Sequence, residues 1–236
     1  MNLPEFEFRD VSVANAYDNV LVPVLFKPWA ASLVGEEPDW SGKTVVDLAT
    51  GTGILATLLA NAVGPKGRVI GVDINREMLA IAKRRCASAG SLASFVESPA
   101  HPLDLPSDTI DTLTCQQGFQ FFPDRGAAAR EIHRVLRQGG RVAVSTWRSV
   151  EECEFFGAVC EALSAVDELD IANAMRVPFD YLPESELASH FESAGFRDVV
   201  VKPQASDFVL VRGPTQAVAT AYSTPVRSAT TAASTP

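Results

Sequence analysis

The chain is poor in the residues that build metal and disulfide sites. It has three histidines, and its four cysteines, Cys86, Cys115, Cys153 and Cys160, are widely spaced without a C-x-x-C pair. This spacing suggests neither a zinc site nor a disulfide framework, so we expect no metal and reduced cysteines. The sequence also lacks H-E-x-x-H, G-x-x-x-x-G-K-[ST] and a Ser-His-Asp order in a suitable loop context. Zincin, P-loop and hydrolase assignments therefore have no support.

Long apolar runs and an excess of positive charge are missing as well. No run approaches the roughly 18 to 20 apolar residues that cross a bilayer, and the acidic N-terminus lacks the basic and apolar regions of a signal peptide. A balance of 29 acidic against 20 basic residues, for a formal charge of −9, disfavours non-specific attraction to nucleic acid or anionic membranes. We expect a cytoplasmic protein with a small-molecule substrate, no nucleic-acid partner and no stable membrane insertion, either a monomer or a homodimer.

The composition is that of an ordinary globular protein. Of 236 residues, 47% are hydrophobic and 21% are charged, which is enough apolar material for a substantial core. One domain with elaborations is the default expectation for this length.

The most informative stretch runs from Thr44 to Gly53. A short β-branched run ends in Asp47, turns through Gly51 and Gly53, and enters residues 54–63, where apolar positions recur at helical spacing. This order predicts a strand, a tight turn and a helix. Glycines let the backbone approach a bulky ligand, and the start of a helix offers free N–H groups to electron-rich atoms. The stretch therefore predicts the beginning of a nucleotide site.

Two kinds of nucleotide fit the glycine pattern. Gly51 to Ala56 satisfies G-x-G-x-x-G/A, and Asp73 lies at about the spacing of the ribose-binding acid of dinucleotide enzymes. Asp47 separates the cases, because a carboxylate here repels a pyrophosphate and attracts an ammonium group. The acid favours a ligand with a cationic amino-acid moiety.

Five blocks in this order resemble the class I S-adenosylmethionine-dependent methyltransferases of the ubiquinone and menaquinone type. The first is Val45-Val46-Asp47-Leu48-Ala49-Thr50-Gly51-Thr52-Gly53, and it is followed by Val69 to Ile74. Phe95 to Ala100, Ile110 to Gln117 and Arg134 to Arg141 complete the series. Together they cover roughly Thr44 to Trp147, and their ordered occurrence is more specific than any one block.

The resemblance implies an α/β fold, a Rossmann-like doubly wound sheet of seven mostly parallel strands with an antiparallel last strand and helical lid elements. It implies an N-terminal arm and lid helices in 1–43, a cofactor-binding core in 44–148, substrate-side helices and last strands in 149–213, and a C-terminal helix or tail in 214–236. Phe196 to Lys202 and Asp207 to Arg212, joined by a turn at residues 203–205, are the expected last hairpin. The alternative is that Asp207 to Arg212 is an extra piece and the last strand is absent. Val226 to Pro236 has no core pattern and is expected to be a frayed tail.

The resemblance also assigns residues to a cofactor, S-adenosylmethionine. Asp47 would hold the methionine ammonium, with the backbone of the glycine turn, and Asp73 would bind the ribose. The full cofactor-binding set is Asp47, Ala49, Thr50, Gly51, Gly53, Asp73, Ile74, Met78, Pro99, Ala100 and Gln116. Contacts to a small, largely apolar methyl acceptor are expected from Tyr17, Gln117, Phe121 and Trp147, although packing on the sheet is an alternative role for these aromatic residues.

The sequence departs from the family next to the adenine. Ser98-Pro99-Ala100 stands where the family usually has Gly-Asp-Ala, and Pro99 supplies neither a carboxylate nor an N–H donor. His101 follows directly and is the weak candidate for a catalytic base, whereas His133 and His190 lie in amphipathic helices. A protein that binds the cofactor without methylating, as a scaffold or a rearrangement catalyst, therefore remains an alternative, and an NAD-dependent oxidoreductase is a second one. The acceptor atom, oxygen, nitrogen or carbon, stays open.

Overall fold

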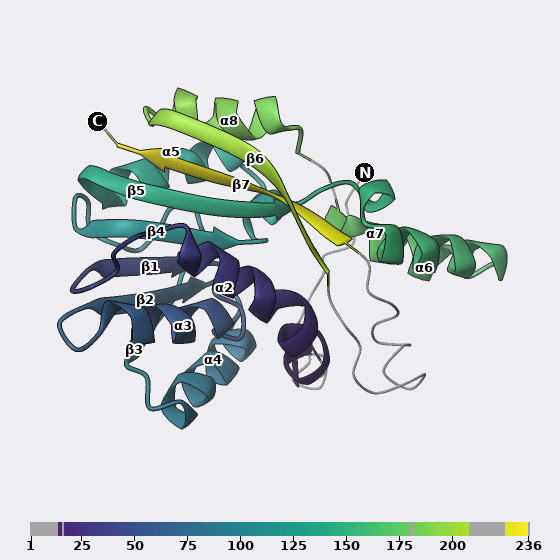
Figure 1. Ribbon diagram of the computed structural model, residues 1–236, viewed down its shortest axis with the longest axis horizontal. Helices are drawn as coiled ribbons and strands as arrows, with labels where there is room; N and C mark the ends of the chain where they lie inside the picture. The colour runs from purple at the N-terminus through teal and green to yellow at the C-terminus, as the bar shows by residue number, and fades with distance from the viewer. Residues whose placement is uncertain (1–13, 16, 180–181, 208–224, 236) are drawn as a thin grey trace.

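A parallel sheet forms the centre of the molecule (Figure 1). The computed structural model describes residues 14–15, 17–179, 182–207 and 225–235. The five central strands are parallel and lie in the order β3-β2-β1-β4-β5. They are β1 (Thr44–Leu48), β2 (Arg68–Asp73), β3 (Ala93–Glu97), β4 (Ile110–Gln116) and β5 (Leu136–Trp147). The strand order reverses between β1 and β4, which is the point where doubly wound folds bind their ligands.

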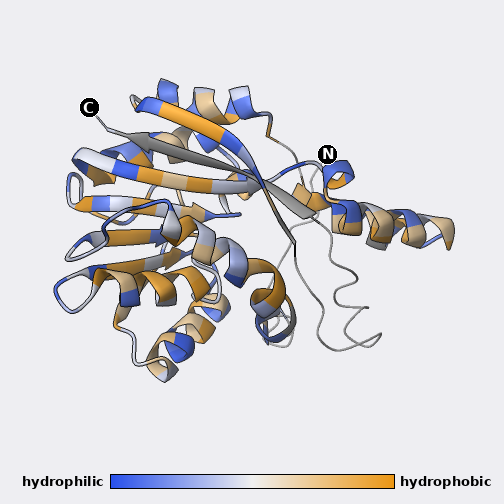
Figure 2. Cartoon of the chain, in the orientation of Figure 1, coloured by the Kyte–Doolittle hydropathy of each residue, from blue (hydrophilic) through white to orange (hydrophobic). Residues whose placement is uncertain are grey.

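Helices cover both faces of this sheet, which explains why the strands are apolar on both sides. Figure 1 shows α2 (Lys27–Gly35), α3 (Ile54–Val63) and α4 (Arg76–Ser88) on one face, and α5 (Arg125–Val135) with α8 (Glu184–Ser193) on the other. Hydrophobic residues accordingly follow the central strands in Figure 2. Val45, Val46 and Leu48 of β1 are all buried, with the first packing toward α3 and the other two toward α5. The α/β Rossmann-like prediction is confirmed for this five-stranded centre.

Local sequence signals set the helix boundaries as expected. Asn75 caps α4, because its Oδ1 accepts hydrogen bonds from the backbone N–H groups of Glu77 and Met78 at 2.9 and 3.1 Å. Gly195 follows α8 with φ +104°, a conformation that favours glycine. Pro28 lies in the first turn of α2, where its missing N–H costs no hydrogen bond. Pro23 lies inside a π-helical segment, η1 (Tyr17–Phe26), and does not end it.

Further helical segments gather beyond the carboxyl ends of the strands. They are η2 (Phe119–Phe121), η3 (Val150–Glu152), α6 (Glu154–Ala165), α7 (Leu169–Arg176) and η4 (Val177–Phe179). Figure 1 shows α6 and α7 extending away from the sheet on the same side as η1. Within the described ranges, none of the helices is long and apolar enough to cross a membrane.

The C-terminal strands differ from the expected hairpin. β6 (Arg197–Asp207) runs without interruption through residues 203–205, where the sequence suggested a turn. An edge strand tolerates Pro203, because some of its N–H groups face no neighbouring strand. β7 (Pro225–Ser234) lies between β5 and β6, antiparallel to both, in the stretch that was expected to be a frayed tail. Backbone hydrogen bonds hold such a strand without an alternating apolar pattern. Residues 208–212 of the expected strand, and the N-terminal arm, lie outside the described residues.

Candidate functional site

The turn between β1 and α3 is built on left-handed backbone conformations. Ala49, Gly51 and Gly53 have φ values of +57°, +54° and +80°. A Cβ added to Gly51 would meet no atom within 4 Å, whereas one added to Gly53 would lie 2.8 Å from the Cβ of Ala82 in α4. Gly51 therefore leaves open space beside the turn. Gly53 instead allows α3 and α4 to pack closely, so the two glycines of the motif have different roles.

Asp47 lies under this turn and is almost completely buried, with 1% of its surface exposed. Its Oδ2 accepts a hydrogen bond from the Thr50 hydroxyl at 2.6 Å, and its Oδ1 faces the Thr114 hydroxyl at 3.3 Å. No cation pairs with it among the described residues. Burial outweighs these hydrogen bonds and raises the pKa of Asp47 to about 7. The site thus holds a buried acid that gains an interaction when a cation binds.

Asp73, at the end of β2, ties the turn to the neighbouring strand. Its Oδ2 accepts a hydrogen bond from the Gly51 N–H at 2.8 Å, and its Oδ1 accepts one from the Asn75 N–H at 2.9 Å. Burial raises the pKa of the Asp73 carboxyl, and these N–H donors partly offset the effect. Asp73 and Asp47 thus flank the same turn, as expected for residues at the ends of adjacent parallel strands.

A small cavity opens between the turn and η1. It is lined by Tyr17, Phe26, Asp47, Ala49, Thr50, Gly51, Thr52, Ile54, Leu55 and Gln116. Its volume is only about 30 Å³, the space of roughly one water molecule. The rings of Tyr17 and Phe26, 5.0 Å apart, close it from the η1 side. The cavity therefore brings together five of the expected cofactor residues, namely Asp47, Ala49, Thr50, Gly51 and Gln116.

Gln116 and Gln117 differ in how their amides are satisfied. Gln116 Nε2 donates to the Phe26 carbonyl at 2.8 Å, whereas its Oε1 is buried and has no partner among the described residues. Gln117 is 4% exposed, has φ +46°, and neither of its amide atoms has a partner in that part of the chain. Its own N–H donates to the Ser145 carbonyl at 2.8 Å, which places it beside the end of β5. Buried amide atoms without partners are costly, so a ligand that reached them would gain hydrogen bonds that the described residues do not supply.

The residues expected near adenine lie after the carboxyl ends of β2 and β3, and none of them lines the cavity. Ile74 is 71% exposed, whereas Met78 is buried in a small cluster with Ala14, Ile81 and Tyr17. Pro99 is exposed and Ala100 half-buried, and both follow β3 in a loop that begins with a hydrogen bond from the Ser98 N–H to the Asp73 carbonyl. Ile74 is thus left open to a ligand, while Met78 belongs to the core.

The structure does not bring His101 to the cavity. It is exposed, and it has a minor electrostatic interaction with Glu131 of α5, on the other face of the sheet. No pairing of His101 with Asp47 or Tyr17 supports a role as a base.

Two of the expected acceptor contacts differ in exposure. Phe121 is 47% exposed, whereas Trp147 is buried against Phe26 and Trp29 at centroid distances of 6.0 and 6.4 Å. In the described residues, no group of three or more His, Cys, Asp or Glu could hold a metal ion.

Sequence reasoning missed two residues that shape this edge. Thr114 on β4 supplies a hydroxyl to Asp47, and only the strand register, which pairs Asp47 with Thr114, reveals it. Gln120 is 3% exposed and lies in a segment that holds three phenylalanines, Gly118 to Pro123. A polar residue inside such a segment was the one available signal.

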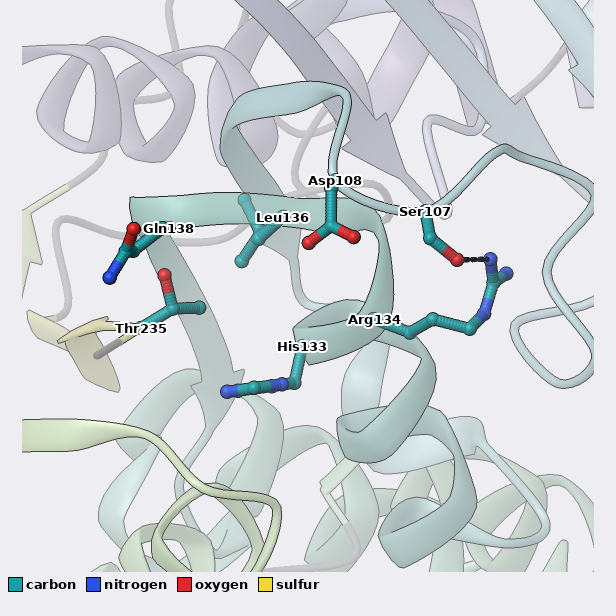
Figure 3. Close-up of a pocket in the computed structure, with 7 residues that line it drawn as sticks. All are labelled: Ser107, Asp108, His133, Arg134, Leu136, Gln138 and Thr235. Atoms are coloured by element: carbon teal, nitrogen blue, oxygen red, sulfur yellow. Dashed lines mark hydrogen bonds between the residues drawn. The ribbon is translucent and has the colours of Figure 1, made fainter.

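A larger cavity, of about 280 Å³, lies at the opposite edge of the sheet, where β4 and β5 begin (Figure 3). Arg134 on its wall is already occupied, since it binds Glu131, the carbonyls of Leu103 and Leu105, and the Ser107 hydroxyl. His133 Nε2 is buried, and a Cβ at Gly195 would lie only 3.2 Å from it. Arg134 and His133 are therefore not available to a ligand, whereas Asp108 on the same wall is exposed.

The sequence and the fold match known methyltransferases. A model of the ubiE/COQ5 methyltransferase family matches residues 8–165. The ubiquinone/menaquinone biosynthesis C-methyltransferase UbiE of Xanthomonas campestris is 36% identical in an alignment 164 residues long, and this alignment covers 61% of this chain and 65% of that protein. The matched region thus spans slightly less than two-thirds of that relative's length. UbiE of Xylella fastidiosa is 31% identical in an alignment 204 residues long, which covers 78% of this chain and 79% of that protein.

A solved structure shows the same fold. The crystal structure of a SAM dependent methyltransferase from Aquifex aeolicus superposes with a TM-score of 0.62 and 19% identity, covering 96% of this chain and 99% of that one. At this identity the likeness concerns the fold.

Proposed function

Because the chain belongs to the ubiE/COQ5 methyltransferase family, we propose that it is an S-adenosylmethionine-dependent methyltransferase acting on a small, largely apolar molecule. The observation that carries the proposal is Asp47, a buried acid without a cationic partner among the described residues, beside a turn that keeps open space at Gly51. A methionine ammonium would supply the missing positive charge. A pyrophosphate would be repelled, which argues against a dinucleotide oxidoreductase.

The donor and acceptor groups of the cavity suit the amino-acid end of this cofactor. Asp47 and the free Oε1 of Gln116 accept hydrogen bonds, as an ammonium group requires, and the backbone of the Ala49, Thr50 and Gly51 turn lies between them. Gly53 supports the turn from the side of α4. Asp73 would accept the ribose hydroxyls with the lone pairs that its two backbone donors leave free.

The adenine would lie against Ile74, whose side chain is the exposed apolar surface next to Asp73. Met78 would support Ile74 from the core, and Pro99 and Ala100 would border the ring from the loop after β3. Recognition of the adenine then rests on packing and backbone groups, because Pro99 has no polar side chain.

Cofactor entry requires η1 to move. A space of about 30 Å³ is far too small for a nucleoside, and Tyr17 and Phe26 occupy the access. Opening η1 would break the hydrogen bond from Gln116 to the Phe26 carbonyl and free the Gln116 amide for the ligand. The described part of 1–43, which holds η1 and α2, would therefore act as a lid on a core formed by 44–148, and the described part of 149–213 would contribute the acceptor side.

When bound, the cofactor supplies an already activated methyl group, so this chain needs mainly to position the acceptor and exclude water. The relatives named above are C-methyltransferases of ubiquinone/menaquinone biosynthesis, and from this we propose an aromatic quinone-type acceptor here. Trp147, Phe121 and Tyr17 would provide the apolar surface. The unpartnered amide of Gln117 would hydrogen-bond a ring oxygen.

The proposal includes the finer features of the fold and setting. The complete sheet has seven strands with β7 antiparallel between β5 and β6, a placement that the register of both pairings supports. The enzyme acts in the cytoplasm, as a monomer or a homodimer. A cofactor-binding protein without transferase activity is the second candidate, and the observation that favours it is Pro99 in place of the usual acid.

Calorimetry with S-adenosylhomocysteine tests the assignment. Parent protein should bind, and Asp73→Ala should lose roughly 1.5 to 3 kcal/mol of binding free energy, because a charged hydrogen-bond partner is removed. Asp104→Ala is the matched control and should bind like the parent, because Asp104 is an exposed acid whose carboxylate has no hydrogen-bond or ion-pair partner among the described residues. Equal affinity of parent and Asp73→Ala would contradict the site. Tight binding of a nicotinamide dinucleotide with no response to S-adenosylhomocysteine would contradict the function, and cofactor binding without methylated product across an acceptor panel would favour the second candidate.

A further inference from the structure

Gln120 connects three separate segments through the two ends of one side chain. Its Oε1 accepts a hydrogen bond from the Trp147 N–H at 3.0 Å, and its Nε2 donates to the Pro178 carbonyl. The side chain is 3% exposed, so neither bond is shared with bulk water. Gln120 itself belongs to η2, Trp147 ends β5, and Pro178 lies in η4. One amide therefore joins the loop after β4, the end of β5 and the segment after α7.

These hydrogen bonds hold main-chain groups that belong to, or directly precede, residues of an aromatic cluster. The rings of Trp147 and Phe179 are 5.9 Å apart, and Phe179 contacts Phe156 of α6 at 4.7 Å. Gln120 binds the main chain of Trp147 and of the residue before Phe179. Fixing both main chains fixes the spacing of the two rings, whereas aromatic packing alone tolerates sliding.

The same cluster continues to the cofactor side. Trp147 contacts Phe26, and Phe26 lines the small cavity together with Asp47 and Gln116. The Trp147 and Phe179 pair is thus separated from the cavity by one ring, at the carboxyl end of β5. This is the edge at which an acceptor meets the cofactor in an open α/β sheet.

From this connection we propose that Gln120 is a positioning residue: it holds Trp147 and Phe179 as a rigid wall for a planar aromatic acceptor and so sets which acceptors fit. The proposal rests on the function proposed above and adds the residue that determines acceptor specificity. Gln120 does not touch the reacting atoms, because both ends of its amide are engaged with main-chain groups.

Removing the amide should affect the acceptor and spare the cofactor. Gln120→Met keeps the approximate side-chain volume but leaves the Trp147 N–H and the Pro178 carbonyl unpaired. Gln120→Glu retains an acceptor for the Trp147 N–H, but it replaces the donor to the Pro178 carbonyl by an oxygen and adds a carboxylate at a buried position. The matched control is Gln138→Met, the same substitution at an exposed glutamine on the opposite edge of the sheet.

Two measurements on the whole 236-residue chain separate this role from the proposed function. Amide hydrogen exchange of Val177 and Phe179, which flank Pro178, should become at least about tenfold faster in both Gln120 variants, and Trp147 exchange should become faster in Gln120→Met alone. Affinity for 1,4-naphthalenediol, measured anaerobically with saturating S-adenosylhomocysteine, should fall at least about tenfold in Gln120→Met. S-adenosylhomocysteine affinity should stay within about twofold of the parent in every variant.

Each result decides one question. Unchanged exchange in Gln120→Met, unchanged naphthalenediol affinity, or equal losses of naphthalenediol and S-adenosylhomocysteine would overturn the positioning role. Failure of the parent to bind S-adenosylhomocysteine would overturn the proposed function instead, and the exchange result would still report on the clamp. If Gln120→Met does not fold, Gln120→Glu carries the same test through the exchange of Val177 and Phe179 and the naphthalenediol affinity.

Discussion

Asp47 offers the sharpest test of the site, because its burial opposes stability and favours ligand binding. Burial raises the pKa of this carboxyl from 3.8 to about 7. When the folded pKa lies above the unfolded value, the protonated form stabilises the fold; this contribution is fully present below about pH 4 and is lost as pH rises through about 7. A difference of about three between the folded and the unfolded pKa corresponds to about 4 kcal/mol of unfolding free energy, lost by pH 8.

Asp47→Asn removes this cost, because the amide is neutral at every pH. Without ligand, the variant should be more stable than the parent at pH 8 by on the order of 2 to 4 kcal/mol, and the difference should shrink toward pH 4. Urea unfolding from pH 4 to pH 8.5 measures it, with Asp104→Asn as an exposed control. A variant that is less stable than the parent at pH 8 would refute the assignment of Asp47 as a buried, unpaired acid.

Cofactor affinity should depend on pH in the opposite sense. The ammonium needs the ionised carboxylate, whose fraction falls about tenfold between pH 8 and pH 6 for a pKa of about 7. Affinity for S-adenosylhomocysteine should therefore weaken about tenfold over this range, or about 1.4 kcal/mol. In Asp47→Asn the affinity should be low and the pH dependence absent. An Asp47→Asn protein with parent affinity and an unchanged pH profile would show that the carboxylate faces no cation.

The two glycines and Gln116 give further predictions. Gly51→Ala should cost about 1 to 2 kcal/mol for its left-handed backbone and should also weaken S-adenosylhomocysteine binding, because the added methyl points into open space beside the turn. Gly53→Ala should cost more, about 2 to 4 kcal/mol, because its Cβ would also meet Ala82, and most of this loss should appear as a lower Tm. Equal stability losses in the two variants would contradict their different roles. Gln116→Leu should weaken S-adenosylhomocysteine binding at least about tenfold in calorimetry, since it removes both the tether to Phe26 and the free acceptor. Parent affinity in Gln116→Leu would exclude that amide from the site.

The core of the fold was predictable because its signals are local. The β-branched run of β1, the turn glycines and the stripe of α3 are contiguous, and α3 begins and ends at the expected residues. Asn75 marks the start of α4, because its side chain caps the helix through backbone groups within the next three residues. These elements follow one another along the chain, so their order alone places Asp47 and Asp73 at the same edge.

The C-terminal strands and the detailed roles of site residues depend on distant partners. β7 pairs with β5 and β6 through backbone hydrogen bonds, which leave no pattern in a stretch of alanine, serine and threonine. The close approach of Gly53 to Ala82 and the hydroxyl that Thr114 gives Asp47 arise from packing and register. Sequence spacing cannot separate a glycine that admits a ligand from one that admits a neighbouring helix.

The position of η1 explains why the residues of the proposed cofactor site are in place although the cavity between them is only about 30 Å³. Tyr17 packs over the same turn, and its pKa is raised by burial and by the negative charge of Asp73. Its ring thus covers two acids, Asp47 and Asp73, that both lose solvation without gaining a cation among the described residues. A cationic ligand would relieve this cost as it displaces the ring, so binding energy is available to open η1. Tyr17→Ala should therefore strengthen S-adenosylhomocysteine binding if covering the acids is the main role of the ring, and weaken it if the ring also packs on the bound ligand. Calorimetry on this variant at pH 8, where Asp47 is mostly ionised, distinguishes the two.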